Sequence, residues 1–497
     1  MSGKAYPGAG AAPGNASMTA RARRAQVVPR LRDIVGAEHV LDGEADRQVY
    51  GYDASVFRGT DILAVALPED AGQVARIVSM TRALGVPVVA RGAGTGINGG
   101  ALPQGQVVVV GLARMNRVLR VDPDNRLCTV EPGVVNQDLK EHLARLGFGF
   151  TYVPDPGSQV VSTVGGNVGN NAGGMHCLKY GVTANHILGL EMVLPDGEIV
   201  ELGGAAAGRP GADLTGLMVG SEGTLGIVTR VTLKIMPLPE TVVTQLALFP
   251  TVADAARAVS GIMAAGILPA ALELLDKKMM TIVDRHVHVG YPASAGASLI
   301  IEMDGLKDGM EVELRRVQEV CNANGAVDIK TARTAQEAHA LWLSRRAAYG
   351  SMARLSPTVY VIDCSVPRNL LAEAIAGVVR ICDGLGLDVV TVAHAGDGNL
   401  HPLIPYDRND PRSRSAAMKA HHEIMALCVG LGGSITGEHG VGVEKQEELA
   451  LMYNPDELAV MFGVKQALDA QDLCNPRKVF PASLFPPTDP ESRARPA

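Results

Sequence analysis

The chain has 497 residues, of which 47% are apolar, and a formal net charge of −7. This length corresponds to about two to four domains with enough apolar material for a packed core. The acidic balance and the 4% aromatic content argue against a nucleic acid as the main partner. No apolar run reaches the roughly 18–20 residues of a membrane-spanning helix. The seven cysteines are widely spaced without a Cys-x-x-Cys pair, which argues against a disulfide framework or a cysteine-held metal cluster.

The first half of the chain alternates between helical and strand patterns. We expect residues 1–25 to be unstructured, although the run from Met18 to Arg24 also fits the start of a helix. Helical spacing follows from Gln26 to about Asp46. The next expected elements are a helix over 69–84, strands at 86–90, 107–110 and 127–130, a helix over 137–146, a hairpin of 187–194 and 198–202 with an Asp-Gly turn, and a strand at 227–235.

A Pro-containing segment, Met236–Pro239, marks a boundary, and a second α+β pattern follows it. The expected elements there are strands at 242–249, 270–275, 298–303, 358–365 and 388–394, and helices over 251–265, 306–324, 368–385 and 413–431 and through Trp342–Arg345. The sequence therefore predicts a two-part α+β protein.

Strand 86–90 runs into the glycine-rich segment Arg91–Gly100. Residues Gly94–Gly99 fit the pattern G-x-G-x-x-G, which marks a Rossmann site for NAD only where a helix begins. Pro103, Gly105 and the next strand leave no room for that helix, so we reject an NAD site. The backbone N–H groups of this loop suit a diphosphate instead.

Two further segments are dense in glycine and asparagine. One runs from Pro154 through Thr163–Gly174 to Gly181, and the other is Val219–Val228. Glycine permits close backbone approach and asparagine supplies amides for the edge of a flat ring. For any one segment alone, a structural loop without a ligand is the better explanation, but three such loops in one domain favour a ligand site.

These segments, with Val130–Gly133, resemble the FAD-binding domain of vanillyl-alcohol-oxidase-type (PCMH-type) flavoproteins. The resemblance runs from about Val40 to Pro481 and is strongest to the branch of glycolate oxidase flavin subunits, D-lactate dehydrogenases and D-2-hydroxyglutarate dehydrogenases. It implies an α+β fold with a two-subdomain FAD-binding domain at 26–238 and a substrate (cap) domain with an antiparallel sheet and a metal site at 239–455. Residues 456–484 would return to the FAD domain, and 485–497 would form a disordered tail.

The resemblance also implies which residues bind FAD, with the first loop on the pyrophosphate, the second along the ribityl and isoalloxazine, and the third near the adenine. Because the first loop has no histidine to tether the flavin, we expect FAD to be non-covalent. The implied residues are Arg91, Gly92, Ala93, Gly94, Thr95, Gly96, Asn98, Gly99, Pro154, Gly157, Ser158, Gly165, Gly166, Asn167, Asn171, Gly174, Gly181, Glu222, Gly226, Ile227 and Asn475.

A histidine-rich turn follows strand 388–394. The pattern His394-Ala-Gly-Asp-Gly-Asn-Leu-His401 predicts a strand, a turn and a second strand that place the two histidines side by side. Paired neutral imidazoles suit a divalent metal, which needs a further ligand. The other histidines, His176 among them, are expected to be ordinary structural or solvated side chains.

Glu438 and His439 lie in the glycine-rich turn 432–442, which we expect to precede a helix beginning at Glu444. As neighbours in an extended turn they would point opposite ways, so that one ligates while the other faces a substrate. A helix N-terminus and a metal would disfavour the protonated form of His439, which suits a general base. The family resemblance makes His394, His401 and Glu438 the metal ligands, with Zn²⁺ first and Mn²⁺ or Fe²⁺ as alternatives, and His439 the base.

Two adjacent arginines on a helix are usually solvated, but the family's W-x-x-R pattern assigns Arg345 to the substrate carboxylate. The hydroxyglutarate branch has a threonine and a lysine where this chain has Tyr349 and Val361. That difference favours a short monocarboxylate over a dicarboxylate.

The resemblance therefore implies an FAD-dependent D-2-hydroxy-acid dehydrogenase that oxidises glycolate or D-lactate, with D-2-hydroxyglutarate as the alternative substrate. Electrons would pass to an iron–sulfur or second flavin subunit, a cytochrome or a quinone. A non-catalytic flavin-binding electron-transfer subunit is the alternative of another class. We expect a dimer or hetero-oligomer in the cytoplasm, with peripheral association at the inner face of the membrane as an option.

Overall fold

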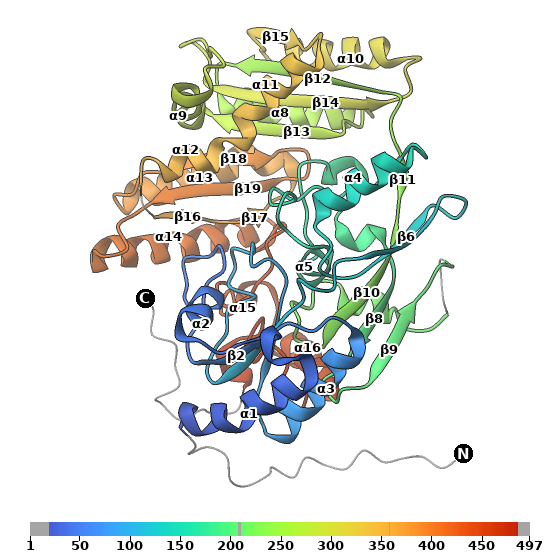
Figure 1. Cartoon of the computed structure of the whole chain (residues 1–497). Helices are drawn as coiled ribbons and strands as arrows, with labels where there is room; N and C mark the ends of the chain where they lie inside the picture. Colours follow the sequence, from blue (N-terminus) through green and yellow to red (C-terminus); the bar gives the residue numbers. More distant parts are fainter. Residues whose placement is uncertain (1–18, 207–209, 357, 486–497) are drawn as a thin grey trace.

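The computed structural model describes residues 19–206, 210–356 and 358–485, which form a lower and an upper lobe (Figure 1). The lower lobe begins with a mixed sheet in the order β1-β2-β4-β3, in which β2, β4 and β3 are parallel. Helices α1 and α3 pack on it through apolar residues such as Leu31 and Ile77. The elements are α1 (Ala20–Val35), β1 (Val40–Leu41), α2 (Glu44–Tyr50), β2 (Ile62–Ala66), α3 (Ala71–Ala83), β3 (Val88–Arg91) and β4 (Val107–Gly111).

Two predictions for the N-terminal region are wrong. The chain is helical from Ala20, where Thr19 caps α1, so residues 20–25 are not unstructured and the alternative of a helix start in this run is confirmed. Residues 1–18 lie outside the described part. The helix ends at Gly36, which has a φ of +90°, rather than near Asp46. Between β3 and β4, residues 92–106 contain no helix, which confirms the rejection of a Rossmann site.

The second part of the lower lobe is an antiparallel sheet in the order β5-β6-β10-β8-β9. The glycine-rich segment after Thr163 is helical over α5, because the Thr163 hydroxyl accepts from the N–H of Gly166 at 3.3 Å. The elements are β5 (Val118–Asp122), β6 (Leu127–Val130), α4 (Asn136–Leu146), β7 (Phe150–Thr151), α5 (Val164–Asn170), α6 (Cys177–Tyr180), β8 (Ile187–Val193), β9 (Ile199–Gly203), α7 (Leu214–Met218), β10 (Ile227–Lys234) and β11 (Met236–Pro237).

The upper lobe is built on an antiparallel sheet in the order β15-β12-β14-β13-β18-β19-β16, with β17 paired to β19. The expected two-part α+β fold with an antiparallel sheet in the second part is confirmed. The elements are β12 (Thr241–Phe249), α8 (Val252–Ala264), β13 (Ala271–Asp276), α9 (Lys277–Val287), β14 (Ala297–Gly305), α10 (Met310–Ala323), β15 (Asp328–Thr331), α11 (Ala335–Arg346), α12 (Ala348–Ala353), β16 (Val359–Val361), β17 (Cys364–Ser365), α13 (Leu371–Gly384), β18 (Val390–His394) and β19 (Asn399–Pro405).

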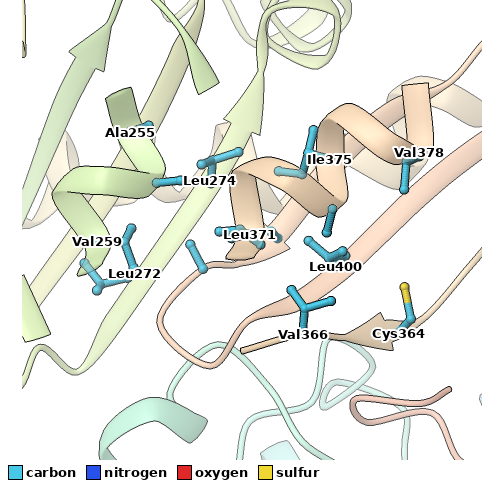
Figure 2. Packing of buried hydrophobic residues seen from close by; sticks show 14 of the residues in the cluster. Ala255, Val259, Leu272, Leu274, Cys364, Val366, Leu371, Ile375, Val378 and Leu400 are labelled. Carbon is cyan, nitrogen blue, oxygen red and sulfur yellow. The ribbon is translucent and has the colours of Figure 1, made fainter. Parts of the chain in front are cut away.

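The two faces of this sheet bury different helices. On one face, side chains such as Leu272, Leu274 and Leu400 pack against α8 and α13 (Figure 2). On the other face, Leu275, Ile300 and Val392 pack against α9, α11 and α12. Because side chains alternate along a strand, Glu273, Glu302, His394 and His401 lie on this second face.

After α14 (Pro411–Gly430) the chain returns to the lower lobe (Figure 1). The carbonyl of His439 accepts from Asn170 of that lobe, the N–H of Val441 donates to Glu222, and Cys474 forms a parallel bridge with Val88 of β3. The helix expected from Glu444 is absent over 443–448, which form turns; α15 (Leu449–Met452) and α16 (Pro455–Leu468) follow. No helix of the described residues is long and apolar enough to cross a membrane.

Candidate functional site

A cavity of about 300 Å³ lies where the three glycine-rich loops of the lower lobe meet. Its walls come from segments 90–101, 156–173 and 221–228. Glu438 and His439, which follow α14 (Pro411–Gly430) in the chain, also line it. The predicted flavin-binding residues that line it are Arg91, Gly92, Ala93, Gly94, Thr95, Gly96, Asn98, Gly157, Ser158, Gly165, Gly166, Asn167, Glu222 and Gly226.

The other predicted residues do not line the cavity and instead support its walls. Pro154 accepts from Asn136, and Asn475 donates to the carbonyls of Gly100 and Glu222 at 2.8 and 2.6 Å. Asn171 ends α5, where its side chain accepts from Ala184. The remaining ones are Gly99 beside Val443, Gly174 beside Asp155, Gly181 at the end of α6, and Ile227 in the core.

Two features of the walls suit a polar, flat ligand held by backbone. A side chain at Gly92 would collide with the Thr163 hydroxyl at 2.4 Å, so only glycine lets these two loops meet. Among the described residues, the buried Asn167 Nδ2 and Ser162 Oγ at the cavity have no hydrogen-bond partner in the protein. Buried polar atoms normally have partners, and the polar edges of a flavin would supply them.

Three histidines converge on one carboxylate oxygen beside this cavity. The distances from Glu438 Oε1 are 3.3 Å to His394 Nε2, 3.2 Å to His401 Nε2 and 3.5 Å to His439 Nε2. His394 and His401 come from paired strands, as the sequence predicted, with ring centroids 5.1 Å apart. One nitrogen or oxygen atom from each of His394, His401 and Glu438 lies within 4.8 Å of the others, close enough to hold a metal ion, and the same is true of Asp363, His401 and His439.

Glu438 and His439 do not point opposite ways, contrary to the prediction. Residues 437–439 are wrapped around the buried Asp363, whose carboxylate accepts from all three backbone N–H groups at 3.0–3.3 Å. Lys445 Nζ, itself fully buried, donates to the same carboxylate at 3.0 Å. Because this turn is not extended, both side chains reach the same centre.

The charges of the cluster shift its pKa values strongly. Burial opposes the charge of His394, but Glu273 and Glu438 raise its pKa well above the usual value. Burial also opposes ionisation of Glu438, and the histidines nevertheless hold its pKa well below its usual range. Burial lowers the pKa of His439, whereas Asp363 and Glu438 raise it, with a net upward direction. The protein groups alone therefore do not disfavour protonated His439. The helix N-terminus expected to do so is absent, because residues 440–448 form turns and irregular structure.

Arg345 is placed next to this cluster through Glu273. Its Nε donates to Glu273 Oε2 at 2.6 Å, while His394 Nδ1 lies 2.6 Å from Glu273 Oε1. Glu273 is fully buried on β13. Glu273, Asp363 and Lys445 carry no local signal in the sequence, because each lies in an ordinary strand or turn pattern and meets its partners only in the folded chain.

Side chains of the lower lobe hold the turn that carries His439 against the cavity. Glu222 accepts from the N–H groups of Val441 and Gly442 at 2.7 and 2.9 Å, and from Asn98 Nδ2 at 3.0 Å. Burial raises the pKa of Glu222 to about 6, although these donors oppose the shift. Asn170 Nδ2 donates to the His439 carbonyl at 2.7 Å. The cavity and the histidine cluster therefore form one site.

Comparison with known proteins identifies both parts of the chain. Residues 62–203 match the model of an FAD binding domain, and residues 238–479 match the C-terminal domain of FAD linked oxidases. The glycolate oxidase subunit GlcD of Escherichia coli K12 is 39% identical over 458 residues, 92% of this chain and 91% of the relative. A D-lactate dehydrogenase of Anaerostipes hadrus is 31% identical over 470 residues, 91% of this chain and 97% of the relative.

The solved structure of 4-ethylphenol oxidase from Gulosibacter chungangensis is similar with a TM-score of 0.78 at 19% identity, covering 93% of this chain and 99% of that one. That of p-cresol methylhydroxylase has a TM-score of 0.76 at 18% identity, covering 94% and 98%. These two structures show the fold. Together with the relatives, they identify this chain as a member of the FAD-linked oxidases, an FAD-dependent oxidoreductase with the vanillyl-alcohol-oxidase (PCMH) type of fold.

Proposed function

We propose that the protein is a metal-assisted D-2-hydroxy-acid dehydrogenase, with glycolate or D-lactate as the leading substrates. The names of the glycolate oxidase and D-lactate dehydrogenase relatives support the substrate class. The observation that carries the mechanism is the convergence of His394, His401, Glu438 and His439 beside the flavin cavity.

The donor set suits a divalent ion held by His394, His401 and Glu438. Tetrahedral Zn²⁺ with bonds of about 2.0–2.1 Å separates its ligand atoms by about 3.3 Å. Glu438 Oε1 lies 3.3 and 3.2 Å from the two imidazole nitrogens. Glu273 behind His394 is the kind of carboxylate that orients a metal-bound imidazole. Mn²⁺ and Fe²⁺ are the alternatives.

When bound, FAD would provide the acceptor for a hydride from the substrate C2, and a divalent ion would polarise the 2-hydroxyl. His439 takes the hydroxyl proton on its Nε2, which faces the cluster. His439 would be held more in its neutral, proton-accepting form if a divalent ion were bound beside it, because the positive charge would oppose the upward shift of its pKa. Arg345 binds the substrate carboxylate through its outer nitrogens, since its Nε is engaged by Glu273.

The proposal favours a small monocarboxylate. Tyr349, four residues after Arg345, is 53% exposed and uncharged. Val361 on β16 provides no cation for a second carboxylate. The relative named as a glycolate oxidase subunit suggests that electrons pass to a partner subunit, with an iron–sulfur or second flavin subunit, a cytochrome or a quinone as candidates.

The direct test is anaerobic mixing of the FAD-loaded protein with glycolate, D-lactate, L-lactate and D-2-hydroxyglutarate. We expect bleaching of the oxidised flavin by glycolate or D-lactate, loss of bleaching after chelation, and recovery with Zn²⁺. If none of these 2-hydroxy acids reduces the flavin, the proposal is overturned. The protein would then be a flavin-binding subunit that has no substrate of its own.

A further inference from the structure

A hydrogen-bonded chain crosses between the two lobes at His176, outside the histidine cluster. His176 Nδ1 lies 2.7 Å from Asp155 Oδ2, and its Nε2 lies 2.7 Å from Glu302 Oε1. The backbone N–H of His176 also donates to Asp155 Oδ1 at 3.3 Å. Because both ring nitrogens face carboxylates, the arrangement is fully satisfied only by the imidazolium, which donates twice. Burial lowers the pKa of His176, but the two carboxylates outweigh it and raise the pKa to about 10.

The two ends of this chain belong to the two halves of the reaction site. Asp155 lies in the loop 154–158, whose next residues, Pro156–Ser158, line the flavin cavity. At the other end, Glu302 Oε2 accepts from Trp342 Nε1 at 2.6 Å and from the Thr244 hydroxyl at 3.3 Å. Trp342 is buried on α11.

Helix α11 also carries Arg345, one turn after Trp342, so the two side chains leave the same face of the helix. Trp342 binds Glu302 and Arg345 binds Glu273, and both carboxylates lie on the same face of the sheet. The helix is thereby connected at one point, through Glu302 and His176, to the flavin loop, and at another point, through Glu273, to His394.

We propose that His176 is a positioning residue that sets the placement of α11, and with it of Arg345, relative to the flavin loop. This inference rests on the proposed function, because it takes Arg345 as the group that binds the substrate carboxylate. Charge-assisted hydrogen bonds at both ring nitrogens leave the bridge little freedom. A misplacement of about 1 Å in a substrate-binding group can cost on the order of 10²-fold in rate.

The first test compares His176→Gln with Lys179→Gln. Glutamine carries no positive charge, and its side chain cannot donate hydrogen bonds in both of the directions in which the two imidazole nitrogens point. Lys179 forms an ion pair with Asp304 that also joins the lobes but contacts neither Asp155 nor Trp342 in the interactions of the described residues. We expect His176→Gln to raise KM for the active 2-hydroxy acid about tenfold or more, with a smaller change in kcat, and Lys179→Gln to leave KM near the wild-type value. Equal effects of the two variants, or an unchanged KM in His176→Gln, would overturn the inference.

The second test needs no turnover. Asp155→Asn and Trp342→Phe form a double-mutant cycle, measured as the apparent Kd for FAD by flavin fluorescence in the apoprotein. We expect the two changes to be coupled in the wild-type background and additive in His176→Gln. Additivity in both backgrounds would refute the bridge. If no hydroxy acid reduces the flavin of the wild-type protein, the proposed function is refuted and not the bridge. The double-mutant cycle would still decide whether His176 couples the lobes.

Discussion

Arg345 and His394 share one buried carboxylate: Arg345 Nε lies 2.6 Å from Oε2 of Glu273, and His394 Nδ1 lies 2.6 Å from Oε1. The residue proposed to bind the substrate carboxylate and a residue proposed to bind the metal are therefore oriented by the same group. A shift of either side chain must move or unpair Glu273, which has no access to solvent. In the proposed mechanism, this pair of contacts would fix the spacing between the group that binds the substrate carboxylate and the group that binds the metal.

We predict that Glu273→Gln weakens Zn²⁺ binding by about 10- to 100-fold, because the carboxylate behind His394 is lost. KM for the hydroxy acid should rise as well, since Arg345 loses its ion pair. Competition with a chromogenic chelator measures the zinc affinity. Glu302→Gln is the matched control, because Glu302 lies on the same sheet face but contacts His176 and Trp342, and it should keep the zinc affinity. An unchanged zinc Kd in Glu273→Gln would contradict the assignment of His394 as a ligand.

Replacement of His439 separates the base from the ligands. We expect His439→Ala to keep its bound metal while flavin reduction slows by about 10²- to 10⁴-fold, the usual contribution of a general base. Glu438→Gln should lose the metal and the activity together. Metal content by elemental analysis and stopped-flow reduction give the two readouts. If His439→Ala loses metal as completely as Glu438→Gln, the ion is held by the alternative set of Asp363, His401 and His439.

The strand-turn-strand around His394 and His401 could be predicted from sequence, because alternation and a glycine-containing turn are local signals. The pairing of Val392 with His401 and of His394 with Asn399 follows directly from that turn. The three glycine-rich loops were equally visible, and the cavity lies where they meet. Local patterns therefore predicted both components of the site.

The directions of Glu438 and His439 were not predictable in this way. They depend on Asp363, a distant residue that no local pattern marks, and on the buried Lys445 beside it. The same limit applies to His176, whose partners Asp155 and Glu302 come from the two lobes. A helix was expected at Glu444 from composition, but tertiary contacts of Val443 and Lys445 hold that segment in turns.

Asn475 lies in the C-terminal segment that returns to the flavin loops, and its replacement tests whether this segment supports FAD binding. Asn475→Asp removes the Nδ2 donor to the carbonyls of Gly100 and Glu222 and places a negative charge beside them. We expect the Kd for FAD to rise about tenfold, because a lost buried hydrogen bond costs about 1–3 kcal/mol. Fluorescence titration of the apoprotein measures this change. Asn409→Asp, on an exposed turn of the upper lobe, is the control, and equal FAD affinity in both variants would refute the role of Asn475.

The charged bridge at His176 should make stability depend on pH in the alkaline range. Its pKa is raised from about 6.5 to about 10 in the folded protein, so its contribution is complete below pH 6.5 and is lost as the pH rises through about 10. We predict that the free energy of unfolding of the wild type falls more steeply between pH 6.5 and 10 than that of His176→Gln, measured by urea titration.

Other titratable groups lie near His176, and the experiment between pH 6.5 and 10 needs a control for them. Asp155 and Glu302 face the two ring nitrogens of His176, and Lys179 and Tyr180 face Asp304, two residues beyond Glu302 on β14. Lys179→Gln therefore serves as the background control for alkaline titration near the bridge, and it should keep the steep wild-type slope. Parallel curves for the wild type and His176→Gln would show that the imidazole is neutral in the folded protein. In that case the His176 ring could donate to only one of Asp155 and Glu302, and the slope must come from other groups of the chain.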